Sequence, residues 1–319
     1  MGAGTSSQSA IRTPQSAISL APRPLLKWAG GKRQLLPQLR RFYPEQFGAY
    51  IEPFVGSGAV FFDLLAAGRL DGHDVTLIDA NPDLIGCYEL VRDEPAAVAE
   101  ALEALAAGHA REGRAFYYRV RDEQFNPERA RRRDAGGRIT YTPALAAMFV
   151  YLNRTGYNGL FRVNSHGAFN VPAGRYVRPD IANRARLNAV ADALGRPRVH
   201  VQYSSFTAAL AIARPGDFLY IDPPYEPVSR TANFTSYTDR RFDARDQRDL
   251  HEAVLALARQ GCHVLLSNST AQHIARLYDR NVEARQAGLR ALRVPARRAV
   301  NSNATRRGPV FEYLITNQP

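Results

Sequence analysis

The sequence contains few of the residues that build disulfide frameworks or metal centres. Only two cysteines occur among 319 residues, Cys87 and Cys262, and they are far apart and lack a partner motif. The seven histidines are scattered and show no spacing typical of metal ligands. The sequence therefore supports neither a disulfide-rich fold nor a zinc site, and we expect no metal cofactor.

Long hydrophobic runs are also missing. No window approaches the roughly 18 consecutive apolar residues of a membrane span, and the start of the sequence lacks a cationic stretch followed by an apolar signal core. Residues 1–20 are polar and are predicted to form a flexible tail. The hydrophobic content of 45% can bury a sizeable core. We expect a soluble cytoplasmic protein with no membrane partner.

Negative charge is scarce relative to positive charge. The 42 lysines and arginines outnumber 30 aspartates and glutamates, giving a net charge of +12 and a pI near 10.0. Residues 154–198 contain eight arginines and two acids, and residues 276–307 contain nine arginines and two acids. This excess favours a polyanionic partner, because each cation placed against a phosphate releases counterions. A solvated basic surface is the plainer alternative.

Several segments predict alternating strands and helices. The stretch YIEPFVGSGAVFFDLL (50–65) is typical of a strand, a glycine turn and a helix, and HDVTLIDANPDLI (73–85) of a strand ending at Asp79 and a second helix. The order returns late in the chain, with a strand at 217–225, an amphipathic helix ending at Gly261, and another strand. We predict an α/β fold with a parallel, doubly wound sheet.

The middle of the chain differs from this pattern. Residues 95–130 are helical in pattern, 131–143 indicate a basic loop, and the following stretch is rich in Gly, Asn, Arg and aromatic residues. We therefore predict a second, mainly helical domain at 95–190, inserted into a sheet domain formed by residues 21–94 and 191–319.

Two glycine-containing segments are typical of ligand-binding turns. In PLLKWAGGKRQLLPQL (24–39), glycines and lysines precede a helix and can hold an anion, although a loop with Trp28 in the core fits equally well. Gly56-Ser57-Gly58 follows a strand, and Asp79 ends the next one, where nucleotide-binding folds place the carboxylate that holds ribose hydroxyls. No third glycine completes a GxGxxG pattern, which favours an adenosine-containing cofactor without phosphates over a dinucleotide.

The stretch DFLYIDPPYEP (217–227) ends an apolar strand with an acid, two prolines and a tyrosine. Asp222 and the carbonyl of Pro223 can accept hydrogen bonds from an amino group, Pro223 and Pro224 stiffen the backbone, and Tyr225 offers a flat face for stacking. We interpret this stretch as a pocket for an exocyclic amine on a heteroaromatic ring. A proline turn with a capping aspartate is the alternative.

Taken together, six motifs in this order resemble the Dam-type DNA adenine methyltransferases of the D12 class, from about residue 24 to the end. The resemblance implies a Rossmann-like S-adenosylmethionine-dependent methyltransferase domain with an inserted target-recognition domain. The motifs are KWAGGK (27–32), EPFVGSG (52–58), IDAN (78–81), NRTGYNGLFRVN (153–164), GAFNVPAGRY (167–176) and DPPYEPVSRTANFTSY (222–237).

The resemblance also implies roles for single residues. S-adenosylmethionine would contact Trp28, Lys32, Phe54, Gly56, Gly58, Asp79 and Asp222. The catalytic residues would be Asp222, Pro223, Pro224 and Tyr225, acting on an adenine swung out of the duplex. Direct methyl transfer then requires no metal.

Residues of the middle segment, together with Lys27 near the start of the chain, match the family's DNA-reading positions. Arg162 matches the guanine-reading arginine, although a phosphate contact is the alternative. The other matching positions are Lys27, Tyr157, Asn158, Leu160, Pro172 and Tyr176. They are filled as in relatives that recognise GATC, so GATC is the expected site.

Other functions stay open on the sequence alone. The same chemistry could act on another DNA sequence, on cytosine or on RNA, or the chain could be a catalytically silent DNA-binding relative. We expect double-stranded DNA as the partner and no obligate protein partner, and a cognate restriction endonuclease is possible. The Arg-rich stretch from Arg129 to Thr142 could contact phosphates or be disordered.

Overall fold

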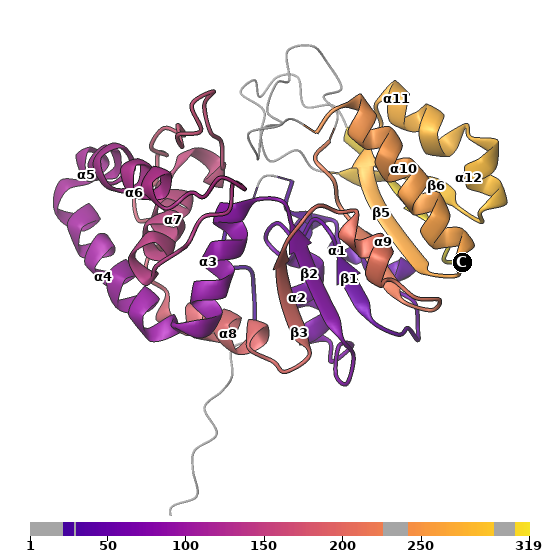
Figure 1. Cartoon of the computed structure of the whole chain (residues 1–319), viewed down its shortest axis with the longest axis horizontal. Coiled ribbons are helices and arrows are strands. Elements are labelled where there is room, and N and C mark those ends of the chain that lie inside the picture. Colours follow the sequence, from indigo (N-terminus) through magenta and orange to yellow (C-terminus); the bar gives the residue numbers. More distant parts are fainter. Residues whose placement is uncertain (1–21, 29, 226–241, 297–309) are drawn as a thin grey trace, which may run out of the picture.

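The computed structural model describes residues 22–28, 30–225, 242–296 and 310–319. The predicted α/β class with a Rossmann-like sheet is confirmed, because a seven-stranded sheet forms the centre of the molecule (Figure 1). The predicted flexible tail at 1–20 lies outside the described residues, as do residues 226–237 of the last motif.

The sheet has the strand order β3-β2-β1-β4-β5-β7-β6. The first five of these strands are parallel, and β7 is antiparallel to both β5 and β6. The order reverses between β1 and β4, which is where doubly wound sheets bind ligands at the carboxyl ends of their strands. The strands are β1 (Tyr50–Glu52), β2 (Val75–Asp79), β3 (Val199–Tyr203), β4 (Phe218–Ile221), β5 (His263–Ser269), β6 (Arg290–Ala296) and β7 (Val310–Thr316).

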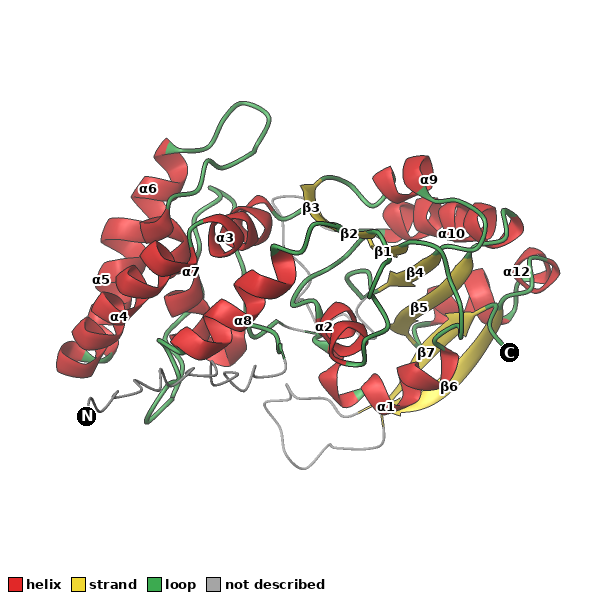
Figure 2. Ribbon diagram, turned by 90° about the horizontal axis from the view of Figure 1, so that it is seen from below, coloured by secondary structure: helices red, strands yellow, loops and turns green. Residues whose placement is uncertain are grey.

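Helices cover both faces of the sheet, with α1 and α2 below it and α9 and α10 above it in Figure 2. The apolar side chains of the central strands accordingly point both ways: Tyr50 belongs to the core on one face and Ile51 to the core on the other. The covering elements are η1 (Lys32–Gln34), α1 (Leu36–Leu39), η2 (Arg40–Phe42), α2 (Ala59–Ala66), α3 (Pro82–Asp93), α9 (Ala208–Ile212), α10 (Ala244–Arg259), α11 (Gln272–Ile274), η5 (Ala275–Asp279) and α12 (Val282–Gln286).

A group of helices between β2 and β3 lies beside the sheet (Figure 1). Its buried side chains join the same core as α2 and α3, so these helices pack on the sheet domain without a separate core. The elements are α4 (Pro95–Glu112), α5 (Arg114–Arg119), η3 (Val120–Phe125), α6 (Asn126–Arg131), α7 (Pro143–Thr155), η4 (Tyr157–Gly159) and α8 (Arg184–Leu194). The division into two domains stays a prediction, and its boundary after residue 190 falls within α8.

The interpretation of the Arg-rich stretch at 129–142 needs correction at its start. Arg129 and Arg131 belong to α6, and the Arg129 side chain is buried. Arg131 and Arg132 both pair with Glu128, which offsets part of the local positive charge. The stretch is therefore neither a loop throughout nor a row of unpaired cations.

Two further observations concern the cysteines and the helices. Cys87 and Cys262 are both buried free thiols. Within the described ranges, none of the helices has the length and apolar character needed to cross a bilayer.

Candidate active site

Asp222 follows β4 at the carboxyl edge of the sheet and is held by side chains from two other elements. Lys32 Nζ lies 2.8 Å from Asp222 Oδ1, and the hydroxyl of Ser267 on β5 donates to the same oxygen at 2.9 Å. Burial raises the pKa of the Asp222 carboxyl above its ordinary value, and the Lys32 ammonium and the Ser267 hydroxyl oppose that rise. Both contacts therefore converge on one oxygen of the carboxylate, Oδ1.

Tyr225 is fixed at both its ring and its hydroxyl. The hydroxyl donates to Glu312 Oε2 on β7 at 2.8 Å, while Lys32 Nζ lies 4.5 Å from the ring centroid. The same ammonium also donates to the carbonyl of Gly30 at 2.6 Å. Lys32 therefore connects the glycine-containing segment at 27–32 with Asp222 and Tyr225, two of the predicted catalytic residues.

The backbone of the DPPY stretch is braced from α10. Gln247 donates from Nε2 to the carbonyl of Pro224 at 3.1 Å, and Asn268 on β5 donates to Gln247 Oε1 at 3.1 Å. Both supporting side chains are buried. The rigidity expected from the prolines thus has a second source in a hydrogen-bonded pair of amides.

The glycine turn after β1 wraps around Asp79. The amides of Gly56 and Asn81 donate to its two carboxylate oxygens at 3.0 and 2.9 Å. Gly56 has φ +48°, and a Cβ there would lie 2.8 Å from Trp28 Cδ1, so this position requires glycine. Burial raises the pKa of Asp79 to about 6, although the backbone donors work against it. Gly58, also left-handed at φ +68°, is the N-cap residue just before α2.

Aromatic side chains line both sides of this turn. Phe54 stacks on Phe206 with ring centroids 5.5 Å apart, and Phe242 meets it edge-on at 5.7 Å. Trp28 stacks on Phe161 at 6.1 Å. All the predicted cofactor residues therefore belong to the segments around the carboxyl ends of β1, β2 and β4.

Glu52 is a further carboxyl group at this edge, to which the sequence assigns no role. It ends β1, is 2% exposed, and accepts a hydrogen bond from the Tyr50 hydroxyl at 2.8 Å. Burial raises its pKa from 4.5 to about 8, and the nearby Asp222 and Asp79 carboxylates add to the rise. Glu52 is therefore mostly protonated at neutral pH in the absence of a cation.

This protonation predicts a pH-dependent stability. Because the folded-state pKa of Glu52 is raised, its contribution to stability is full below pH 4.5 and is lost as the pH rises towards about 8. The glutamine side chain of Glu52→Gln does not ionise, so the variant does not lose stability in this way as the pH rises. We expect the unfolding free energy of Glu52→Gln, relative to wild type, to rise between pH 5 and pH 8 by an amount on the order of a few kcal/mol, measured by urea unfolding without cofactor.

The exposed Glu45 provides the control for this measurement. Glu45→Gln should show the same difference from wild type at both pH values. If the difference in unfolding free energy between Glu52→Gln and wild type is also the same at pH 5 and pH 8, Glu52 does not have a raised pKa in the folded protein.

The predicted DNA-reading residues form a second group, carried by the loop after α7. Lys27 joins the cofactor segment to this group: its backbone amide donates to Asn153 Oδ1 at 2.8 Å, and its Nζ lies 3.8 Å from the Tyr176 ring centroid. Burial lowers the pKa of Lys27, as does the neighbouring Arg154. Tyr157 and Tyr176 are large exposed aromatic residues, at 41% and 37%.

The loop geometry between these tyrosines is unusual. Asn158 has φ 53°, the one positive value at a non-glycine position among the described residues. The following Gly159 packs so closely that a Cβ there would lie 2.2 Å from Lys27 Cβ. Pro172 is exposed and Leu160 partly buried beside them.

Arg162 begins a short hairpin that ends at Asn170. Its Nε donates to Asn170 Oδ1 at 2.7 Å, and the backbone amide of Asn170 donates to the carbonyl of Arg162 at 3.1 Å. Val163 and Phe169 pair across the hairpin. Arg162 Nη2 also donates to the carbonyl of Asn170 at 3.4 Å, so Asn170 fixes the Nε–Nη2 edge of the guanidinium.

Arg154, at the end of α7, has no predicted role but an unusual environment. Its side chain is 7% exposed, and its Nε and Nη2 make no hydrogen bond to any of the residues that the structure describes. Asp180 lies 3.8 Å from Nη2, and burial lowers the arginine's pKa. A buried guanidinium with open donors is suited to an anion arriving from outside the protein.

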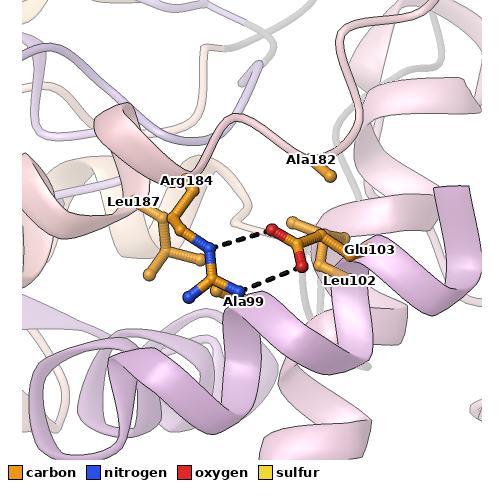
Figure 3. Close-up of a pocket in the computed structure, with 6 residues that line it drawn as sticks. All are labelled: Ala99, Leu102, Glu103, Ala182, Arg184 and Leu187. Atoms are coloured by element: carbon orange, nitrogen blue, oxygen red, sulfur yellow. Dashed lines mark hydrogen bonds and ion pairs between the residues drawn. The ribbon is translucent and has the colours of Figure 1, made fainter.

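Two further observations concern metal-binding groups and a pocket away from the site. The described residues contain no group of three or more His, Cys, Asp or Glu side chains placed to hold a metal ion. A small pocket between α4 and α8 is closed by the Arg184–Glu103 pair (2.9 Å), and these helices carry none of the predicted site residues (Figure 3).

Comparisons with known proteins show the family to which this chain is similar. Residues 28–292 match the model of a family described as D12 class N6 adenine-specific DNA methyltransferase. A type II methyltransferase of Lactococcus lactis subsp. cremoris is 36% identical, over 92% of this chain and 95% of its own length. A DNA adenine methylase of Escherichia coli (strain K12) is 34% identical, over 93% and 96%.

Proposed function

Because this chain belongs to the D12 class of N6 adenine-specific DNA methyltransferases, we propose that it methylates the adenine of GATC in duplex DNA. In this proposal, residues 21–94 and 191–319 bind S-adenosylmethionine and residues 95–190 recognise the DNA. The observation that carries the proposal is that Asp222 and Tyr225 lie at the sheet edge, next to the Asp79 turn. Lys32 contacts both residues, and Lys27 of the same segment contacts Tyr176 in the arginine-rich segment 154–198.

The residues at the sheet edge suit S-adenosylmethionine. Asp79 would accept the ribose hydroxyls, Phe54 and Trp28 would pack against the adenosine, and the side-chain-free Gly56 would let the cofactor approach the backbone. Glu52 would ionise to accept a cationic group. When bound, the cofactor supplies a methyl group activated by a positively charged sulfur.

The DPPY residues would act on the amino group of adenine. Asp222 and the Pro223 carbonyl would accept its two hydrogens, which directs the nitrogen lone pair and stabilises the positive charge that develops on it. Tyr225 would stack on the base. Lys32 now lies against both Asp222 and Tyr225, so the arriving base would take over these contacts.

This chemistry requires the adenine to leave the duplex, since its amino group is inaccessible to the active site inside the base stack. Tyr157, exposed on the loop after α7, would occupy or flank the vacated space together with Asn158. Tyr176 would contact the same region. Flipping would account for the exposure of these large aromatic side chains.

Sequence reading would come from Lys27 and the loop after α7. Arg162 would donate to the two acceptors of guanine in the major groove, and Lys27 would contact the outer guanine. Leu160 and Pro172 would pack against thymine methyl groups. Arg154, with its open donors, would hold a backbone phosphate.

Sequencing that detects modified bases in cellular DNA tests the proposal. Cells without adenine methylation of their own are made to express this chain, with cells expressing Asp222→Ala as the matched background. We expect N6-methyladenine at the adenine of GATC, at most sites and on both strands. Methylation at another context would overturn the site, and its absence in both cultures would overturn the activity.

A further inference from the structure

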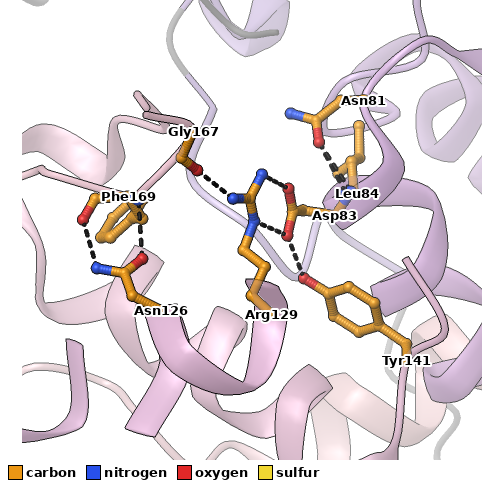
Figure 4. Close-up of polar contacts among 8 residues, drawn as sticks. All are labelled: Asn81, Asp83, Leu84, Asn126, Arg129, Tyr141, Gly167 and Phe169. Atoms are coloured by element: carbon orange, nitrogen blue, oxygen red, sulfur yellow. Dashed lines mark hydrogen bonds and ion pairs between the residues drawn. The ribbon is translucent and has the colours of Figure 1, made fainter. Parts of the chain in front are cut away.

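A buried ion pair connects the start of α3 with α6 (Figure 4). Arg129 Nε and Nη2 donate to the two oxygens of Asp83 at 2.6 and 2.8 Å, and the Tyr141 hydroxyl donates to Asp83 Oδ1 at 2.8 Å. The Asp83 side chain is 0% and the Arg129 side chain 6% exposed. A two-pronged contact between planar groups fixes distance and orientation together.

The same guanidinium reaches the hairpin that carries Arg162. Arg129 Nη1 donates to the carbonyl of Gly167, at the turn of this hairpin. Asn126, one helical turn earlier on α6, exchanges two hydrogen bonds with the backbone of Phe169, at 2.8 and 3.0 Å. The hairpin is therefore attached to α6 at two residues, Asn126 and Arg129. Arg129 is also bonded to Asp83, so it links the hairpin to α3 as well.

Asp83 is also close to Asp79, because the first turn of α3 directly follows the turn that holds the Asp79 carboxylate. Asn81 caps α3 by accepting from the amides of Asp83 and Leu84, at 3.0 and 3.2 Å, and its own amide donates to Asp79 Oδ1. A change in the β2–α3 turn would therefore be passed to the first turn of α3, and with it to the carboxylate that holds Arg129.

We propose that Arg129 is a positioning residue which couples the cofactor turn to the DNA-reading hairpin through Asp83 and Gly167. The inference rests on the proposed function, because it takes Asp79 as the ribose ligand and Arg162 as the reader of guanine. Cofactor binding then favours the hairpin position that fits the methylated sequence, and by linkage the correct DNA tightens cofactor binding by the same factor.

The buried pair suits this role better than a purely stabilising one. Apolar residues of similar volume often replace a buried ion pair without loss of stability, whereas a guanidinium bonded to three oxygens holds two elements in one register. Tyr141 donates to the carboxylate from a third direction, which further limits its movement. The contacts thus restrict the hairpin more than packing alone requires.

The test compares DNA affinity with and without S-adenosylhomocysteine as the cofactor probe. The duplex is the one that the enzyme itself methylates, paired with a duplex changed at one base of that site. For wild type we expect the probe to tighten selective binding about tenfold. In the double variant Asp83→Asn with Arg129→Met, no charge stays buried without a partner, and the probe should have less than a twofold effect.

The control is Tyr141→Phe, which removes a hydrogen bond to the same carboxylate and leaves the connection from Asp83 to Gly167 in place. It should keep the wild-type coupling. Arg129→Lys gives a second test, since it keeps the charge but cannot make the two-pronged contact with Asp83. This variant should retain the fold and lose most of the coupling. Cooperative thermal unfolding checks the fold of each variant.

The outcomes separate this inference from the proposed function. A wild-type protein without any probe effect overturns the coupling, and so does a double variant that keeps the tenfold effect. Equal weakening of DNA binding with and without the probe also overturns it, because a structural role alone predicts that result. A methylated site other than GATC overturns the site assignment and leaves the coupling measurement intact.

Discussion

Asp222→Ala is expected to reduce the rate of methyl transfer roughly a thousandfold or more while the cofactor still binds. The substitution removes an acceptor for the adenine amino group, and it also removes the carboxylate 2.8 Å from the Lys32 ammonium. Because the proposed ribose and adenosine contacts lie on other segments, cofactor affinity should fall only severalfold. Single-turnover transfer and equilibrium binding of S-adenosylhomocysteine separate these two effects.

Asp222→Asn is the matched variant. Its amide keeps the size of the side chain and one oxygen for Lys32 and Ser267, so the local hydrogen bonds persist. We expect more activity than in Asp222→Ala and much less than in wild type, because a neutral oxygen stabilises the developing charge less well. Transfer near the wild-type rate in Asp222→Ala would remove this residue from the mechanism.

Arg162→Ala is expected to relax sequence selection more than it weakens DNA binding. A good pair of hydrogen bonds to guanine contributes about 1–3 kcal/mol to discrimination, so the preference for GATC over a duplex changed at the guanine should fall about 10- to 100-fold. The substitution also removes one positive charge and leaves Asn170, which now orients the guanidinium, without this partner. Binding to both duplexes at several salt concentrations measures the effect.

Arg178→Ala serves as the comparison, since Arg178 is exposed on the same segment and has no predicted base contact. Any phosphate contact there would weaken binding to both duplexes alike. If Arg162→Ala shows that same pattern, with the salt dependence reduced by about one charge, Arg162 contacts a phosphate and does not read guanine.

The elements around the active site could be predicted because their signals are local. The glycine turn at 56–58 and the Asn81-Pro82 helix start each act within a few residues, and both were confirmed. The strand predicted at 217–225 was confirmed only at Phe218–Ile221, because the prolines that follow Asp222 cannot donate a backbone hydrogen bond to a neighbouring strand. The strands towards the two ends of the sheet carried weaker signals. β3 alternates buried and exposed positions, and β7 pairs between β5 and β6, which no local pattern specifies.

The supporting side chains of the site could not be predicted for the same reason. Gln247 and Glu312 contact the DPPY stretch from 23 and 87 residues further along the chain, and neither lies in a recognisable pattern. Glu52 stood inside a quoted motif, but only its burial beside Asp222 and Asp79 distinguishes it from an ordinary surface acid.

Arg129 shows how similar residues in a sequence can differ in structure. It belongs to a run of arginines that the sequence interprets as one basic loop, yet its side chain is 6% exposed and that of Arg131 is 66% exposed. Only the fold, which brings Asp83 to it across 46 residues, reveals the difference.

Counting methyl groups transferred to synthetic duplexes tests the central claim most directly. The purified protein is incubated with labelled S-adenosylmethionine and one of three duplexes that differ only at a single GATC. If the N6 atom of that adenine is the target, an unmethylated site accepts two methyl groups, a site methylated on one strand accepts one, and a site with N6-methyladenine on both strands accepts none. Equal labelling of the fully methylated duplex would contradict the account.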